Sequence, residues 1–334
     1  MSAAICAGKE GKPQMSEILK VNNLKKFFHV KAGTLHAVDN VNFSIERGET
    51  LGIVGESGCG KSTLGRVLVH LHESTGGTLE FEGQDITKVD RKRLSELRKD
   101  MQMIFQDPFS SLNPRMTIFQ TLAEPLEIAG GKLSGKDIEE RVYQMMDTVG
   151  LARRLVNSYP HELDGGRRQR IGIGRALILQ PKFIVCDEPV SALDVSIQAQ
   201  VINLLLDIQE EMGLTYVFIT HDLMVVKYIS DHIMVMYLGQ VVEKADKNDL
   251  FAHPLHPYTQ ALLSAVPVPN TKQKKERVLL KGEITSPINP KPGCRFAVRC
   301  PYAMEKCKEE SPELLEVRPR HMAACHFTNK LMNF

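Results

Sequence analysis

The stretch Gly55-Glu56-Ser57-Gly58-Cys59-Gly60-Lys61-Ser62-Thr63 decides the fold class, because it fits the pattern G-x-x-x-x-G-K-[ST]. It follows Thr50–Val54, an apolar run that predicts a buried strand, and it leads into a helical stretch from Ser62 to about His70. Glycines let the backbone curl so that several N–H groups converge on phosphate oxygens, and the helix presents its positive end. The loop is therefore predicted to bind nucleotide phosphates rather than to be a glycine-rich turn with a chance Lys-Ser pair.

Two side chains of this loop have specific expected roles. Lys61 should reach the β- and γ-phosphates of ATP, and the Ser62 hydroxyl should ligate Mg²⁺. The remaining expected nucleotide contacts are Gly55, Ser57, Gly58, Cys59, Gly60 and Thr63.

A second apolar run ends in two carboxylates. Phe183–Asp187 predicts another buried strand, which ends at Asp187 and is followed by Glu188. Asp187 at the strand tip can hold the magnesium shell, usually through water, while Glu188 points the other way and can polarise the attacking water as general base. A solvated strand end is the alternative, and the nearby phosphate-binding motif disfavours it.

The rest of the core predicts an α/β fold. Segment 18–46 reads as β-rich, Gln198–Met212 as an amphipathic helix and Tyr216–Thr220 as a third buried strand. Residues 91–150 read as mostly helical, interrupted by prolines at 108, 114 and 125. Strands that alternate with helices predict a parallel sheet covered on both faces.

Composition excludes several classes of protein. The 334 residues suffice for one large domain and a smaller one, and 42 basic against 40 acidic residues give a net charge of +2, which makes no case for nucleic acid. The chain contains no run of about 18 apolar residues, so no membrane span is predicted. Residues 1–17 read as a flexible tail rather than a signal peptide. We therefore expect a cytosolic protein whose membrane role, if any, comes through partners.

Five further features resemble landmarks of the ABC ATPases, over roughly residues 18–250. Leu163–Arg170 (LDGGRRQR) is similar to the signature segment of that family, usually spelled LSGGQ. The others are Gln106 as the Q-loop glutamine, Asp194 in the D-loop, His221 as the switch histidine and Phe28 as the aromatic that stacks on adenine, with Phe27 as its rival.

This resemblance implies a P-loop ABC-type ATPase domain over 18–252 that hydrolyses ATP. The implied catalytic residues are Glu188, His221, Gln106 and Lys61, and the implied magnesium ligands are Ser62, Gln106 and Asp187. Two such domains meet head to tail in this family, so that Asp164, Gly165 and Gly166 would face the nucleotide of a second subunit, identical or related. The single motif set in this chain implies that it needs that partner.

The signature segment departs from the family at two positions. Asp164 stands where the family has Ser, and Arg167 stands where it usually has Gln. An ionised carboxylate cannot donate to a γ-phosphate, so one interpretation is a weakened composite site. The favoured interpretation is that Asp164 caps the signature helix.

The C-terminal part, 253–334, resembles that of oligopeptide and dipeptide importers. His253–Leu263 contains the H-P-Y segment of these systems, and the Q-loop region Phe105–Arg115 is also similar. The resemblance implies peptide import through two transmembrane permease subunits and an external substrate-binding protein, with this chain at the cytoplasmic face of the membrane. Related systems carry nickel or glycosides, and a soluble ABC ATPase is a remote alternative. Without the resemblance, 253–258 would read as a proline-broken surface loop.

Four cysteines, Cys294, Cys300, Cys307 and Cys325, crowd into this tail, which favours a metal site over disulfides in a reducing compartment. All-thiolate sites suit zinc and iron–sulfur clusters. The resemblance favours a structural [4Fe-4S] cluster, with Zn²⁺ as the alternative, in which His321 or His326 replaces one thiolate. Further alternatives are four unligated thiols, and a redox- or metal-sensing protein in which the cysteine module is primary and ATP is regulatory.

Overall fold

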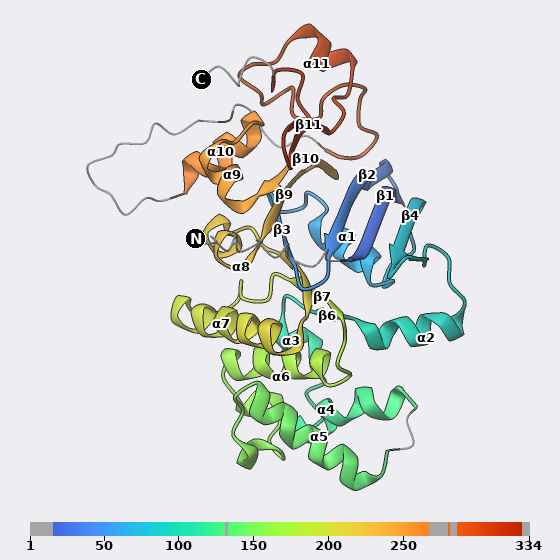
Figure 1. Cartoon of the computed structure of the whole chain (residues 1–334), viewed down its shortest axis with the longest axis vertical. Helices are drawn as coiled ribbons and strands as arrows, with labels where there is room; N and C mark the ends of the chain where they lie inside the picture. The colour runs from blue at the N-terminus through green and yellow to red at the C-terminus, as the bar shows by residue number, and fades with distance from the viewer. Residues whose placement is uncertain (1–15, 131–132, 267–279, 281–285, 329–334) are drawn as a thin grey trace, which may run out of the picture.

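The computed structural model describes residues 16–130, 133–266, 280 and 286–328. Most of the expected N-terminal tail therefore lies outside the described residues, as does 272–277, a run of mostly charged residues in the sequence. The described chain is elongated: a helical region lies at one end, the four-cysteine tail at the other, and the sheets in between (Figure 1).

A large mixed sheet forms the centre of the described part of the chain. Its strand order is β11-β12-β10-β9-β3-β8-β7-β6, and β9, β3, β8, β7 and β6 run parallel. The strands are β3 (Thr50–Val54), β6 (Met101–Ile104), β7 (Phe183–Asp187), β8 (Thr215–Ile219), β9 (His232–Tyr237), β10 (Gln240–Asp246), β11 (Leu315–Arg318) and β12 (His321–Ala323). The predicted strands at β3, β7 and β8 are confirmed.

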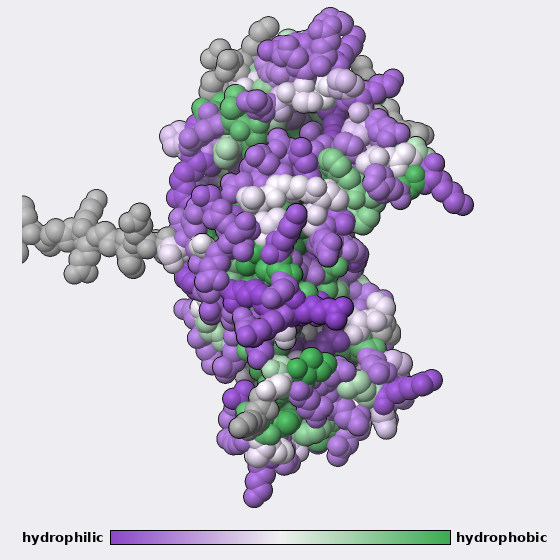
Figure 2. Space-filling view, turned by 90° about the vertical axis from the view of Figure 1, so that its right-hand side faces the viewer, coloured by the Kyte–Doolittle hydropathy of each residue, from purple (hydrophilic) through white to green (hydrophobic). Residues whose placement is uncertain are grey.

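A smaller antiparallel sheet has the order β2-β1-β4-β5. Its strands are β1 (Glu17–Val30), β2 (Gly33–Glu46), β4 (Gly76–Phe81) and β5 (Gln84–Asp85). The face of the molecule on this side is mainly hydrophilic, with separate hydrophobic patches (Figure 2), and most apolar side chains of β1, β2 and β4 are buried.

Helices cover both faces of the central sheet. The helices of the described residues are α1 (Lys61–Leu68), α2 (Arg91–Asp100), α3 (Pro108–Ser111), α4 (Ile118–Ile128), α5 (Gly135–Thr148), α6 (Gly165–Leu177), α7 (Val195–Met212), α8 (Leu223–Ile229), α9 (Lys247–Ala252), α10 (Pro257–Ala265) and α11 (Glu305–Glu309), with 3-10 turns at Arg153–Leu155 and Pro160–Glu162. Along β7, Phe183 and Val185 pack with α1 and the small sheet, while Ile184 and Cys186 pack with the α4–α7 layer. This alternation is the period of two that a strand buried on both faces requires.

The structure corrects the expected pattern in two regions. Residues 91–150 also contain a strand, β6, and Pro125 lies inside α4 instead of ending it. The H-P-Y segment is not irregular, because Pro257 occupies the first turn of α10 and His256 caps that helix by accepting from the N–H of Tyr258. Proline has no N–H to lose in a first turn, so it is well tolerated there.

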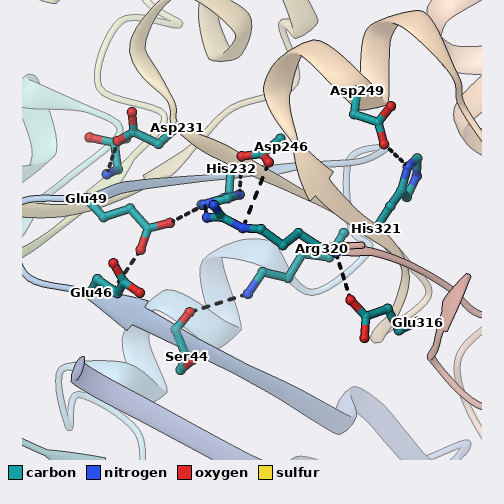
Figure 3. Close-up of polar contacts among 12 residues, drawn as sticks. Ser44, Glu46, Glu49, Asp231, His232, Asp246, Asp249, Glu316, Arg320 and His321 are labelled. Carbon is teal, nitrogen blue, oxygen red and sulfur yellow. Dashed lines mark hydrogen bonds and ion pairs between the residues drawn. The ribbon is translucent and has the colours of Figure 1, made fainter. Parts of the chain in front are cut away.

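The C-terminal strands join the central sheet through buried ion pairs. His321 on β12 lies between Glu243 on β10, with Nε2 2.7 Å from the carboxylate, and Asp249 on α9, with Nδ1 2.5 Å from the carboxylate. His232 bridges Glu49 and Asp246 beside them (Figure 3). Among the described residues, no helix is both long and apolar enough to cross a bilayer.

Candidate nucleotide site

The loop between β3 and α1 has the backbone conformation that its glycines predict. Gly55 and Gly60 have φ values of 155° and 105°. A Cβ at Gly55 would lie 2.2 Å from the carbonyl oxygen of Met236, and a Cβ at Gly60 would lie 2.0 Å from that of Ala37. Gly58 has φ 77° and nothing within 4 Å of its Cβ position. Glycine is therefore required at 55 and 60 by close packing, and at 58 by backbone conformation alone.

Lys61 begins α1 and its side chain is buried against the loop. Its Nζ donates to the carbonyl oxygens of Gly55 at 2.7 Å and Glu56 at 3.0 Å. The ammonium group thus lies inside the curl of the loop, where phosphate oxygens would bind.

Ser62 and Asp187 lie together although 125 residues separate them in sequence. The Ser62 hydroxyl donates to Asp187 at 2.7 Å. Burial raises the pKa of Asp187, and the Ser62 hydrogen bond partly opposes that shift. A hydroxyl next to a buried carboxylate is an oxygen donor set that suits Mg²⁺, so these residues fit the ion that the sequence implies.

Glu188 lies one residue beyond β7 in a left-handed conformation with φ 46°. Its Oε2 accepts from Gln106 Nε2 at 2.9 Å and lies 3.4 Å from His221 Nδ1. Left-handed backbone is uncommon outside glycine and is concentrated at functional sites. The strand end thus turns Asp187 toward the P-loop and Glu188 toward the Q-loop and switch residues.

These groups surround one cavity of about 380 Å³. Its lining consists of Ser57, Gly58, Gly60, Lys61, Ser62, Thr63, Gln106, Glu188 and His221. Gly55, Cys59 and Asp187 support this lining from behind, because each is in direct contact with a lining residue or with the loop backbone. Four stretches far apart in the sequence therefore meet at one site, as expected.

The signature segment does not line this cavity. Asp164 is the N-cap of α6 and accepts from the N–H of Arg167 at 2.8 Å, as expected of a capping carboxylate. Gly166 is packed so tightly that a Cβ there would lie 2.7 Å from Ile197 Cγ2 on α7. Asp194 is the N-cap of α7, so the signature and D-loop segments adjoin each other on the helical side.

Phe28 also lies outside the cavity lining. Its ring contacts His72 edge-on at 5.7 Å, and the ammonium of Lys26 lies 4.9 Å from the ring centroid. The rival Phe27 stacks on His36 at 3.9 Å. Half-buried Phe28 stays a prediction for the adenine-stacking residue, and Phe27 is already occupied by a stacking partner.

The H-P-Y segment is buried rather than a surface loop. The Glu243 carboxylate accepts from the N–H groups of Leu255 and His256, and the hydroxyl of Tyr258 accepts from the N–H of Glu56 in the P-loop. The sequence analysis missed Glu56 and this support behind the loop, because nothing local in the sequence marks a contact between residues 202 positions apart.

The predicted metal site is not formed as a ligand set. In the described stretch that includes all four cysteines, no group of three or more His, Cys, Asp or Glu side chains is arranged to hold a metal ion. Burial raises the pKa of Cys294 to about 11 and that of Cys325 to about 12, with smaller contributions from the other cysteines nearby. A metal ligand is a thiolate, so the raised pKa values of Cys294 and Cys325 oppose ligation. His321 and His326 are engaged elsewhere, with Glu243 and Asp249 and with the Glu310 carbonyl.

Comparison with known proteins places the chain in a family. Residues 38–191 match the family described as "ABC transporter", and residues 242–307 match "Oligopeptide/dipeptide transporter, C-terminal region". The oligopeptide transport ATP-binding protein AppF of Bacillus subtilis is 52% identical over 92% of this chain and 97% of the relative. OppF of Salmonella typhimurium, an oligopeptide transport ATP-binding protein, is 52% identical over 93% and 96%.

Solved structures agree with this placement. An ATP-binding cassette solved as a dimer in a post-hydrolysis state, with ADP and phosphate bound, has a TM-score of 0.64 and 30% identity, and covers 69% of this chain and 99% of its own. CbiO1 of Clostridium perfringens, part of an ABC transporter complex, has a TM-score of 0.63 and 30% identity over 71% of this chain and 91% of its own.

The chain is an ABC ATPase, which binds and hydrolyses ATP. This class is defined by the P-loop, by the two carboxylates at the end of β7 and by the match to solved cassettes. Within that class it belongs to the family of ATP-binding subunits of oligopeptide/dipeptide transporters.

Proposed function

We propose that this chain hydrolyses ATP to power the import of dipeptides or oligopeptides through partner membrane subunits. The observation that carries the proposal is the combination of a complete P-loop half-site with a C-terminal region of the oligopeptide/dipeptide type. The two relatives named above match this chain over nearly their whole length, and both are named for oligopeptide transport.

Glu188 is the general base of the proposed reaction. Its carboxylate lines the cavity and accepts a hydrogen bond from Gln106, so it can polarise a water molecule next to a phosphate bound by the P-loop. His221 contacts the same carboxylate and can hydrogen-bond the γ-phosphate. Lys61 would neutralise charge on the phosphates as the bond to the leaving ADP breaks.

Ser62, Asp187 and Gln106 would hold Mg²⁺. Bound by these residues, the ion would offset the negative charge of the phosphates. The Ser62–Asp187 hydrogen bond keeps both oxygen donors at the edge of the cavity before the ion arrives.

A second ATPase subunit would complete the site. The signature residues Asp164, Gly165 and Gly166 do not line the cavity of their own chain, so the positive end of α6 is free to meet the nucleotide of a partner, as is Asp194 in the adjoining D-loop. ATP between the two chains favours the closed dimer, and its hydrolysis lets the dimer open.

Two permease subunits in the cytoplasmic membrane and an external substrate-binding protein would complete the transporter. The chain would bind the permeases from the cytoplasmic face. The test is uptake of a labelled tripeptide by vesicles that contain the assembled transporter and internal MgATP. Wild type and the surface control Glu139→Gln on α5 should import the peptide, and Glu188→Gln should not. Import of nickel or a glycoside but of no peptide would overturn the peptide assignment and leave the ATPase assignment intact.

We also propose that the four cysteines are ligands of a metal centre, with [4Fe-4S] first and Zn²⁺ second. The support is that four cysteines lie in one small module, in which the Cys294 N–H donates to the Cys307 carbonyl oxygen at 2.7 Å. Their side chains would reorient and deprotonate to ligate. Protein purified without oxygen should show visible absorption for a cluster or contain zinc by elemental analysis. A colourless, zinc-free protein would overturn it.

A further inference from the structure

An arginine next to one of the four cysteines forms an ion pair with the P-loop. Arg299, which precedes Cys300, donates through NH1 and NH2 to both carboxylate oxygens of Glu56, at 2.7 and 3.1 Å. Its side chain is only 9% exposed, and Tyr237 lies beside the guanidinium. Two parallel hydrogen bonds fix the direction of the carboxylate as well as its position. The C-terminal module thus holds the second residue of the phosphate-binding loop.

Glu56 is restrained at three points. Its side chain is held by Arg299, its N–H donates to the Tyr258 hydroxyl at 2.9 Å, and its carbonyl oxygen accepts from Lys61 Nζ at 3.0 Å. Two of these three partners come from the C-terminal part of the chain and one is the phosphate-binding lysine. A shift of Glu56 would therefore move the carbonyl group to which Lys61 is bound.

A second arginine supports the loop from the other side. Arg295, which follows Cys294, donates to the carbonyl oxygen of Leu238 and to Asp39. Gly239, which follows Leu238, donates its N–H to the carbonyl oxygen of Cys59 in the P-loop at 2.8 Å. The four-cysteine module therefore reaches the P-loop at two places, directly at position 56 and through the β9–β10 turn at position 59.

We propose that Arg299 is a positioning residue for ATP hydrolysis, through which the four-cysteine module sets the conformation of the P-loop. Arg299 touches no nucleotide atom, and it acts on Lys61 and the loop N–H groups through Glu56. The proposal rests on the ATPase activity and does not require a metal at the cysteines. Any change that displaces the module would then alter nucleotide binding at a site that contains none of its residues.

The first experiment measures the Kd for MgATP and the KM and kcat of hydrolysis in the full chain. Arg299→Met should weaken MgATP binding roughly tenfold, because misplacing binding groups by a fraction of an ångström costs this much or more. Arg299→Lys keeps the charge but loses the paired donors, so it should fall between wild type and Arg299→Met. The matched control is Lys306→Gln, which removes a positive charge from the exposed side of the same module, and it should bind MgATP like wild type.

A second variant separates positioning from mere stability. Arg299→Met alone leaves Glu56 without its partner, whereas the double variant Arg299→Met with Glu56→Met leaves no unpaired charge and should recover most of the lost thermal stability. Positioning predicts that MgATP binding stays roughly tenfold weaker in the double variant, because apolar side chains do not fix the direction of the loop. Recovery of MgATP affinity together with stability, or wild-type affinity in Arg299→Met, would overturn the proposal.

Discussion

Replacing His321 by Gln is expected to loosen the C-terminal strands from the central sheet. His321 and Glu243 are both fully buried, and Asp249 is 32% exposed. Removing one partner of a buried ion pair costs about 3–5 kcal/mol because the other charge stays uncompensated. Glu243 keeps its hydrogen bonds from Leu255 and His256, so we expect the lower end of that range.

The loss should depend on pH, with a definite sign. Burial alone lowers the pKa of His321, but the hydrogen bonds and charges of Glu243 and Asp249 outweigh it and raise the pKa above its ordinary value. The stabilisation is therefore fully present below the ordinary histidine pKa of about 6.5 and is lost as pH rises through the raised value. In that window the free energy of opening should fall by up to about 1.4 kcal/mol per pH unit.

Hydrogen–deuterium exchange of the β12 amides, corrected for intrinsic rates, measures this opening directly. Wild type should lose protection with rising pH, and His321→Gln should show low protection at every pH. The control His326→Gln, which removes a histidine whose Nε2 lies 3.0 Å from the Glu310 carbonyl oxygen, should behave like wild type. Equal protection in wild type and His321→Gln, or a loss that does not change with pH, would refute the reasoning.

Three further substitutions test individual contacts. Asp164→Ser keeps a capping oxygen, so we expect thermal stability within about 0.5 kcal/mol and little change in ATP turnover; a large rise in turnover would mean that the carboxylate weakens the composite site. Gly60→Ala forces an unfavourable backbone conformation and a clash with the Ala37 carbonyl oxygen. It should destabilise the folded protein by more than about 1–2 kcal/mol and abolish nucleotide binding. Gly172→Ala, in the open middle of α6, should change neither the melting temperature nor nucleotide binding. Tyr258→Phe leaves a buried P-loop N–H without an acceptor, so chemical unfolding should report a loss of about 1–3 kcal/mol, and no loss would show that water replaces the hydroxyl.

The sequence predicted best those elements whose environment is uniform. The strands β3 and β7 were predicted with the bounds that the structure has, because a strand buried on both faces is a continuous apolar run between turns. Strand β6 was missed since it is short, carries a polar Gln102 and follows α2 without a turn. Helix α10 was missed because a proline in a first turn looks the same in sequence as a proline that breaks a helix.

The residues of the site also differ in how well the sequence predicted them. The P-loop residues that line the cavity were predicted because phosphate chemistry requires particular residues at fixed spacing, whereas Gln106 and His221 were expected only from the resemblance to the ABC ATPases. The Arg299–Glu56 pair was not predicted, because its members are 243 residues apart, Glu56 fills a variable position of the P-loop motif and Arg299 belongs to no motif. The predicted metal set had the right residue type, but the side chains of the described thiols do not converge as ligands.

The ATP turnover rate of Glu188→Gln, at saturating MgATP and at a protein concentration that favours the dimer, tests the central claim most directly. Glu188 is the carboxylate oriented by Gln106 and His221 over the P-loop cavity. An amide cannot act as general base, so turnover should fall by at least about 10²-fold while ATP stays bound in a closed dimer. Turnover near the wild-type rate would contradict the assignment of Glu188 as the base and with it this account of the site.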